Sequence, residues 1–338
     1  MAENIASPQS ADGSAPSWAV GDLLVHRIDE VALPPQTGPW LLPAATPDVV
    51  DGTPWLRPHF AGADGVLRLA SHTFAVEANG LRVLIDTGIG NGKTRANPAW
   101  HDLDTDYLHR LTAAGFAPES VDLVVLTHLH TDHVGWNTRR QDGRWVPTFP
   151  RARYLASRAE WDHWANGDLE EPRRQMFRDS VHPIRDAGLL DLVDVRGPGT
   201  EVADGVRLLS TPGHTPGHVA VRLEGGDRDA VVTGDCVHHP VQMRHPDITS
   251  CVDTDPDRAV RSRRELLAGL ADTGTLLLGG HFPPPTAGHV VRDGGGYRLE
   301  AAAPAPRRNG AGGGGRRGDR GAPAPGGRGR GGGGVEKE

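Results

Sequence analysis

The sequence predicts a mixed α/β fold, because strand-like and helix-like segments alternate twice along its 338 residues. Apolar runs rich in β-branched residues, typical of buried strands, occupy residues 121–126 and 230–232. Helix-start signals lie between such runs, for example Asp255-Pro256, which predicts a helix to about residue 271. Several of the apolar runs end in His or Asp. We therefore expect these polar side chains to gather at one edge of the sheets.

Composition limits the class of protein and its compartment. The length allows one large domain or two ordinary ones. Cys236 and Cys251 are the only cysteines and form no CxxC pair, which argues against a disulfide framework and suits a reducing compartment. The first residues carry no secretory signal, and no run of eighteen apolar residues occurs. We therefore expect a cytoplasmic protein without a membrane span.

The chain is predicted to have three parts. Residues 1–17 read as a disordered leader, residues 18–300 as one folded domain, and the Gly/Arg/Pro-rich residues 301–338 as a disordered tail. The tail carries eight Lys/Arg against three acids, a net charge of +5. Because the whole chain has a net charge of −7, residues 1–300 carry −12. The acidic domain argues against nucleic acid as its main partner; a homodimer is left open. The Arg-Gly clusters of the tail are similar to RNA-binding segments but lack interleaved aromatics.

The first third of the domain alternates between strands and loops. Residues 33–62 are Pro-rich and contain Trp40, Trp55 and Phe60, so they form either a surface loop packing its own aromatics or a lid over the active site. The remaining elements are a first strand at 21–28, a hairpin of 67–76 and 81–85 around Asn79-Gly80, and a helix at 102–115 ended by Gly115.

The densest group of chemically active residues is the stretch 127–133, directly after the apolar run 121–126. It holds three histidines and one aspartate within six residues, and these are ligands that suit zinc and its first-row neighbours. In an extended segment His128 and His130 face one way, since side chains alternate with period two. Asp132 and His133 then lie on the following turn and can serve a second metal position. Four solvated loop residues would be the alternative interpretation.

His128-x-His130-x-Asp132-His133 is similar to the metal-binding motif of the metallo-β-lactamase superfamily. The chain also supplies the superfamily's remaining ligands in order, each after a strand: His214, Asp235 and His281. The resemblance covers roughly residues 65–298. It implies an αββα sandwich, in which two sheets pack face to face with helices outside.

The same resemblance implies two Zn²⁺ per chain, with other divalent first-row metals also suitable. In the family's pattern Asp235 bridges the metals, and Asp86 supports a ligating histidine, although a turn-forming Asp is the alternative. A hydroxide between two such metals attacks at neutral pH. The first metal would be held by His128, His130 and His214, and the second by Asp132, His133 and His281.

Asp132 and His238 are the candidate catalytic residues. His238 stands three residues after Asp235, where acyl-homoserine lactonases carry a tyrosine that meets the substrate. Its ring either donates a hydrogen bond to the substrate or leaving oxygen, or satisfies a backbone group. The stretch 280–290 resembles the methyl parathion hydrolase branch of the superfamily more closely than it resembles the acyl-homoserine lactonases. His218 is expected to support a neighbour or to pack rather than to bind metal.

The remaining tryptophans and the later strands and helices complete the predicted domain. Trp136, which is close to the metal motif, either lines the substrate pocket or packs in the core, and packing is expected of Trp161 and Trp164. The predicted elements are a strand at 153–155, a helix from Ser157 to Trp164, a helix at 173–185, and second-sheet strands at 192–195, 206–209 and 219–223.

These observations favour a dinuclear zinc hydrolase acting on a small ester-like substrate, a lactone or carboxylic ester, with phosphotriesters as a side activity. A glyoxalase-II-like thioesterase is an alternative, although no basic patch for glutathione is recognisable. A di-iron redox enzyme would be expected to carry a flavodoxin-like domain after the core, which we do not find in this sequence. A non-enzymatic RNA-associated protein acting through the tail would have no need of seven metal ligands.

Overall fold

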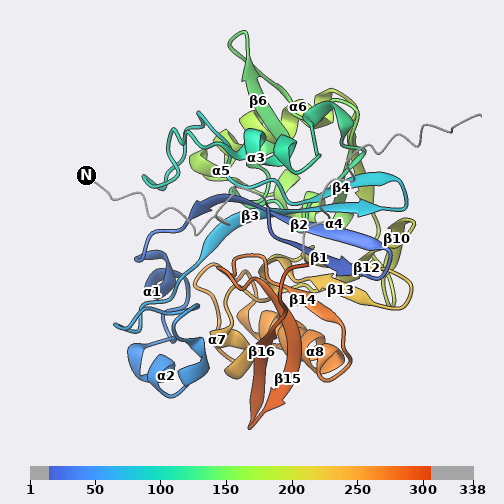
Figure 1. Cartoon of the computed structure of the whole chain (residues 1–338). Coiled ribbons are helices and arrows are strands. Elements are labelled where there is room, and N and C mark those ends of the chain that lie inside the picture. The colour runs from blue at the N-terminus through green and yellow to red at the C-terminus, as the bar shows by residue number, and fades with distance from the viewer. Residues whose placement is uncertain (1–14, 306–338) are drawn as a thin grey trace, which may run out of the picture. The chain divides into compact units, whose positions relative to one another are not determined.

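The computed structural model describes residues 15–305. Most of the predicted leader (residues 1–14 of 1–17) and most of the predicted tail (residues 306–338 of 301–338) lie outside the described residues. Among residues 15–305, two seven-stranded sheets pack face to face with helices on their outer faces, the predicted αββα arrangement (Figure 1). None of the described helices is long and apolar enough to cross a membrane.

The first sheet is antiparallel at its N-terminal side and parallel from β4 onward. In spatial order its strands are β1 (Ser17–Val20), β2 (Leu23–Ala32), β3 (Ala70–Ala78), β4 (Leu81–Ile85), β5 (Leu123–Val125), β8 (Arg153–Ser157) and β9 (Leu190–Val193). A separate hairpin joins β6 (Thr138–Gln141) to β7 (Arg144–Pro147).

The second sheet is antiparallel except for one central parallel pair, β13 with β14. Its strands are β10 (Thr200–Ala203), β11 (Val206–Ser210), β12 (Val219–Glu224), β13 (Asp229–Val232), β14 (Leu276–Leu278), β15 (Ala287–Asp293) and β16 (Gly296–Ala301). Both sheets thus have parallel strands at the centre, β4 with β5 in the first sheet and β13 with β14 in the second. The candidate ligands lie on the loops that follow β5, β13 and β14 of these pairs and on the loop that follows β11.

The helices are short apart from the last one. The α-helices are α1 (Thr37–Leu41), α2 (Pro47–Asp51), α3 (Tyr107–Ala113), α4 (Arg158–Ala165), α5 (Glu171–Met176), α6 (His182–Asp186), α7 (Val241–Arg244) and α8 (Pro256–Leu270). The 3₁₀ turns are η1 (Pro54–Leu56), η2 (Pro118–Ser120), η3 (Gly135–Asn137) and η5 (Gly234–Cys236), and η4 (Phe177–Val181) is a π-helical turn.

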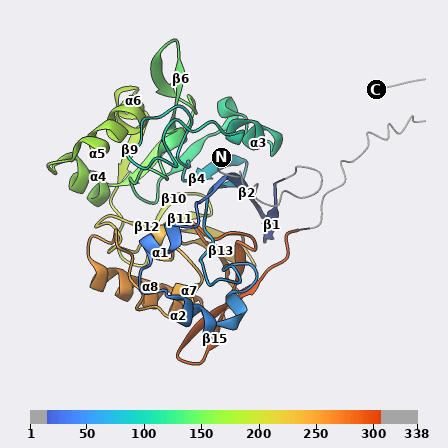
Figure 2. The same ribbon diagram turned by 90° about the vertical axis from the view of Figure 1, so that its left-hand side faces the viewer.

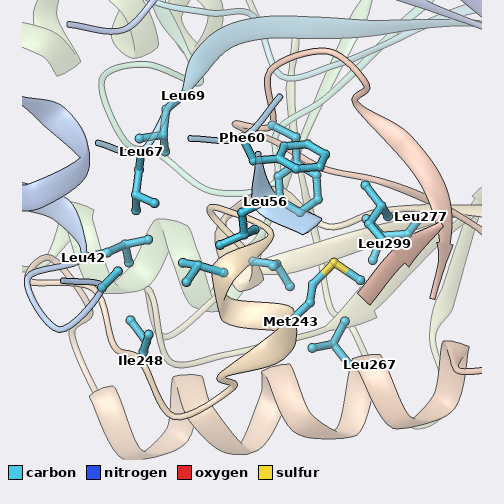
Figure 3. Packing of buried hydrophobic residues seen from close by; sticks show 14 of the residues in the cluster. Leu42, Leu56, Phe60, Leu67, Leu69, Met243, Ile248, Leu267, Leu277 and Leu299 are labelled. Carbon is cyan, nitrogen blue, oxygen red and sulfur yellow. The ribbon is translucent and has the colours of Figure 1, made fainter. Parts of the chain in front are cut away.

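Three apolar cores follow from this layering. One lies between the sheets and joins side chains such as Phe74 and Val125 of the first sheet to Val221 and Leu278 of the second. Another lies between the first sheet and the helices outside it, around Tyr154. The third joins the second sheet to α7, α8 and the segment 33–69; Phe60, Met243 and Leu277 belong to it (Figure 3). Each sheet contributes side chains to two of these cores, because successive residues of a strand point to opposite faces of the sheet.

Local sequence signals set several of the element boundaries as predicted. Asn79 and Gly80 both have positive φ, 49° and 84°, and form the tight turn between β3 and β4. Ser157 caps α4 by accepting a hydrogen bond from the Glu160 amide, 3.1 Å. Asp255 caps α8 in the same way, accepting from the Arg258 amide at 3.0 Å.

Three expectations about elements need correction. The predicted first strand, 21–28, is preceded by β1, which pairs with β2 across the turn at Gly21. The strand predicted at 192–195 lies at 190–193 and pairs in parallel with β8 of the first sheet, so it is not a second-sheet strand. Its half-buried pattern gives no indication of which sheet it joins, and the return from α6 places it beside β8. The helix predicted at 173–185 is continuous but contains the π turn η4.

Candidate metal centre

The candidate ligands lie on loops that follow β5, β11, β13 and β14, and these loops meet at one edge of the two sheets. The ligating atoms of His128, His130, His214 and Asp235 all lie within 4.8 Å of one another. Those of Asp132, His133 and His281 form a second group of the same tightness. All seven residues that the sequence nominated as ligands are therefore brought together in two adjacent groups.

Asp235 lies between the two groups and offers one oxygen to each. Its Oδ2 is 3.3 Å from His214 Nε2 and 3.7 Å from His128 Nε2. Its Oδ1 is 3.3 Å from His133 Nε2 and 3.1 Å from His281 Nε2. This is the placement that a carboxylate bridging two cations requires.

The donor atoms fit divalent metals because several of them are buried without a hydrogen-bond partner among residues 15–305. His128 Nε2, His133 Nε2 and Asp235 Oδ1 are in this condition. Unpaired buried polar atoms are costly, and a cation among these nitrogens and oxygens would satisfy them together. Imidazole nitrogens with carboxylate oxygens and no thiolate are a donor set that suits zinc and its first-row neighbours.

Hydrogen bonds to the remote ring nitrogens fix which imidazole nitrogen faces the centre. His133 Nδ1 donates to Asp86 Oδ2 across 2.8 Å, and His281 Nδ1 donates to the Ala70 carbonyl across 3.0 Å. Asp86 also accepts from the amide and the hydroxyl of Thr127, the residue before His128. Asp86 thus contacts a candidate ligand histidine, as predicted. A contact of this kind orients the imidazole ring and sets its tautomer.

His218 lies beside the centre and supports Asp235. The Asp235 amide donates to His218 Nε2 across 2.9 Å, and the other ring nitrogen pairs with the Thr211 hydroxyl. Burial lowers the pKa of His218 to about 3, so the ring stays neutral and acts as an acceptor. The expectation of a supporting histidine is therefore confirmed.

Two carboxylates next to the centre were missed from the sequence. Asp253 accepts from His214 Nδ1 across 3.0 Å and from the Ser250 amide across 2.8 Å. Glu160 accepts from the amides of Leu129 and Gly217, which lie in two different ligand loops. Leu129 lies between two candidate ligands, and Gly217 lies three residues after His214. The sequence signal of Glu160 was masked because Ser157-x-x-Glu160 reads as a helix-capping box. Asp253 stands in a turn-rich stretch that carries no motif.

A pocket of about 230 Å³ opens over the two groups and is bounded by apolar and aromatic side chains. Trp164 lines it, whereas Trp136 is buried in the outer core, stacks on Tyr107 and donates to Glu30. Packing was expected of Trp164, so that expectation is corrected, and of the two alternatives for Trp136 the structure shows the core position. Part of the 33–62 segment also lines the pocket: Leu33, Thr37, Trp40 and Leu41. In Figure 2, α1 of this segment faces the viewer between the two helical layers.

His238 borders the same pocket and is almost fully buried. Its Nε2 is 3.3 Å from Asp235 Oδ2, and neither ring nitrogen has a hydrogen-bond partner among the described residues. The ring therefore satisfies no backbone group, and the loop is instead held by the His238 amide donating to Gln242. By contrast, His239 is structural, with its Nε2 on the Phe60 carbonyl.

Comparison with known proteins agrees with this geometry. The model of the metallo-beta-lactamase superfamily matches residues 66–281. An N-acyl homoserine lactonase, AttM, of Agrobacterium fabrum is 28% identical over 227 residues, covering 63% of this chain and 78% of that protein. The solved structure of AidC, a dizinc quorum-quenching lactonase, aligns with a TM-score of 0.68 at 22% identity, covering 86% of this chain and 98% of AidC. The hydrolase AbOPH aligns with a TM-score of 0.69 at 24% identity, covering 88% and 99%.

The chain belongs to the metallo-beta-lactamase superfamily, since the match spans more than half of its length and includes all seven candidate ligands. It is a metal-dependent hydrolase whose curated relatives include lactonases.

Proposed function

We propose that the chain is a dinuclear zinc hydrolase that adds water to the carbonyl of a small lactone or carboxylic ester. The observation that carries the proposal is the position of Asp235, which presents one carboxylate oxygen to each of two groups of histidine nitrogens. His128, His130 and His214 would hold the first metal, and Asp132, His133 and His281 the second. Two such dications lower the pKa of a shared water toward neutrality and polarise the substrate carbonyl.

The chain's own residues supply orientation and proton transfer. Asp132 lines the pocket and is half-buried, so one of its carboxylate oxygens can accept the proton released by the attacking water. His238 has no hydrogen-bond partner at either ring nitrogen among the described residues, and it borders the same space. In this proposal its ring donates a proton to the leaving oxygen. Neither role requires a further side chain.

The pocket supports a small substrate with an apolar part. Leu33, Leu41 and Val252 border it together with Trp40 and Trp100. An apolar wall of this kind excludes water around the metals and contacts the alkyl portion of a bound molecule. The sequence similarity to curated N-acyl homoserine lactonases, 28% over 227 residues for AttM, supports a lactone as the first substrate to test.

The proposal is tested by a panel of matched substrates with the metal content measured on the same preparation. We expect two zinc ions per chain and turnover of lactones and aryl esters that exceeds turnover of thioesters and phosphotriesters. Asp235→Ala should abolish most activity and lower the metal content, while Asp257→Asn, an exposed acid at the start of α8, should change neither. Active protein holding one metal or none would contradict the dinuclear site. Preferred turnover of thioesters would contradict the ester assignment.

A further inference from the structure

Arg173, in α5, is the one cationic side chain among the described residues that lines the metal pocket. Its guanidinium lies over the ring of Trp164, 4.1 Å from carbon Cζ to the ring centroid. The Trp164 ring is in turn 5.7 Å from the ring of His130. Trp164 is itself held by a hydrogen bond from its Nε1 to Glu160. Arg173 is therefore fixed beside the first group of ligands.

The guanidinium is short of partners. Nη1 donates to the Leu129 carbonyl across 3.2 Å, and no other hydrogen bond of this side chain occurs among residues 15–305. No carboxylate in that range approaches it within the 4.0 Å of an ion pair, although most of the arginines of the domain have such a pair. Arg173 thus presents free N–H donors at the pocket wall.

Three acids lie near Arg173, and two of them, Glu160 and Asp132, are already engaged; the third, Glu170, is exposed and forms no ion pair with Arg173. Glu160 accepts three hydrogen bonds, from the amides of Leu129 and Gly217 and from Trp164. Asp132 belongs to the second group of ligand atoms. Burial favours compensation of the Arg173 charge, and the described residues leave that compensation to a bound molecule.

We infer that Arg173 binds a carboxylate of the substrate, so that the enzyme prefers esters or lactones that carry a second, anionic group. This inference rests on the proposed ester hydrolysis and narrows its substrate class. A guanidinium pairs with carboxylate oxygens through two parallel N–H donors, and stacking on an aromatic ring fixes its plane. Two metals at the adjacent groups would add to the positive potential that attracts such a substrate.

The test compares two esters with the same leaving group, 4-nitrophenyl pentanoate and the 4-nitrophenyl monoester of glutaric acid, in which a carboxylate replaces the terminal methyl. Arg173→Gln should lower kcat/KM for the glutarate ester, through KM, about tenfold or more beyond any loss that it causes for the pentanoate ester. Arg174→Gln is the matched control, since Arg174 is the next residue in α5, pairs with Glu171 and does not line the metal pocket. It should leave both esters unchanged.

A second readout does not depend on turnover. Calorimetric titration of the metal-loaded protein with glutarate and with butyrate should show tighter binding of glutarate, and Arg173→Gln should remove that difference. Equal losses for both esters together with reduced metal content would mean that Arg173 only holds the Leu129 backbone between two ligands, and would overturn the inference. If neither ester is hydrolysed but glutarate keeps its Arg173-dependent advantage, the proposed ester hydrolysis fails while the carboxylate site stands.

Discussion

His214 and Asp253 are joined by a hydrogen bond from Nδ1 to Oδ1 at 3.0 Å, and both side chains are almost completely shielded from solvent. The loop that carries Asp253 is also tied to the backbone around His214, because the Thr254 amide donates to the His214 carbonyl. The bond leaves Nε2 of His214 as the nitrogen that faces Asp235. Asp253 therefore fixes the tautomer and the direction of a candidate ligand.

The first prediction is that Asp253→Asn weakens metal binding at the first group about 10- to 100-fold, the usual effect of losing a partner of a ligating histidine. The amide keeps the side-chain volume but no longer favours a donating Nδ1. Metal retained against increasing chelator concentration measures the effect without relying on turnover. Asp257→Asn is the control, and equal retention by both variants would show that Asp253 has no part in holding His214.

The second prediction concerns His238→Gln. The variant should keep two metals and its melting temperature but lose turnover, and the loss should shrink for esters with good leaving groups, which need less protonation. A general acid contributes about 10²–10⁴-fold, so the loss on poor leaving groups should be large. A Brønsted plot over substituted phenyl esters measures it. A uniform loss across leaving groups, together with lowered thermal stability, would remove His238 from catalysis.

The third prediction concerns the pH dependence of stability. Lys93 is buried with Arg95 beside Asp179, and burial lowers the pKa of its amine to about 7. The unfolded chain therefore binds more protons than the folded chain between about pH 7 and about pH 10.4, so the contribution of Lys93 to stability rises with pH in that window and levels off below it. The slope should approach about 1.4 kcal/mol per pH unit.

Denaturant unfolding of the native chain and of Lys93→Met at several pH values isolates this contribution, since other titrations cancel in the difference. The stability of the variant relative to the native chain should fall as the pH rises from 7 to 10. A difference that does not change with pH would mean that Lys93 stays charged in the folded protein, paired with Asp179.

The fourth prediction concerns the C-terminal segment. Deleting residues 306–338 should leave turnover and melting temperature nearly unchanged, because Val335 is the only aliphatic residue larger than alanine, proline aside, in that stretch. Deletion from residue 302 should instead lower the free energy of unfolding by about 1–3 kcal/mol. It removes the bonds of Ala302 to Trp18 and Ala287 and of Ala305 to Ser17.

Calorimetric melting of the two truncated proteins beside the full chain distinguishes these outcomes. A large loss on removing residues 306–338 alone would mean that this segment contributes to the domain. If the segment does bind RNA, the affinity of the full chain should fall steeply with salt concentration.

Much of this protein could be predicted from the order of its residues. His128, His130 and Asp132 follow an apolar strand at a spacing that only a few architectures produce, and each later ligand also follows a strand. The short caps and turns at Ser157, Asp255 and Asn79-Gly80 act within three residues of the chain, so local chemistry decides them. For these features, neighbours in sequence are also the physical partners.

Other features depend on residues that are distant in sequence and adjacent in space, and only the tertiary structure decided them. Strand β9 joined the first sheet because the chain returned beside β8. Trp164 lines the pocket, against expectation, because the outer-layer helix α4 borders it, and Trp136 packs against Tyr107 in the core. Asp253 lies 39 residues from His214, and Arg173 lies 44 residues from Leu129. Such contacts leave no periodicity or spacing in the sequence, since packing of whole elements brings these side chains together.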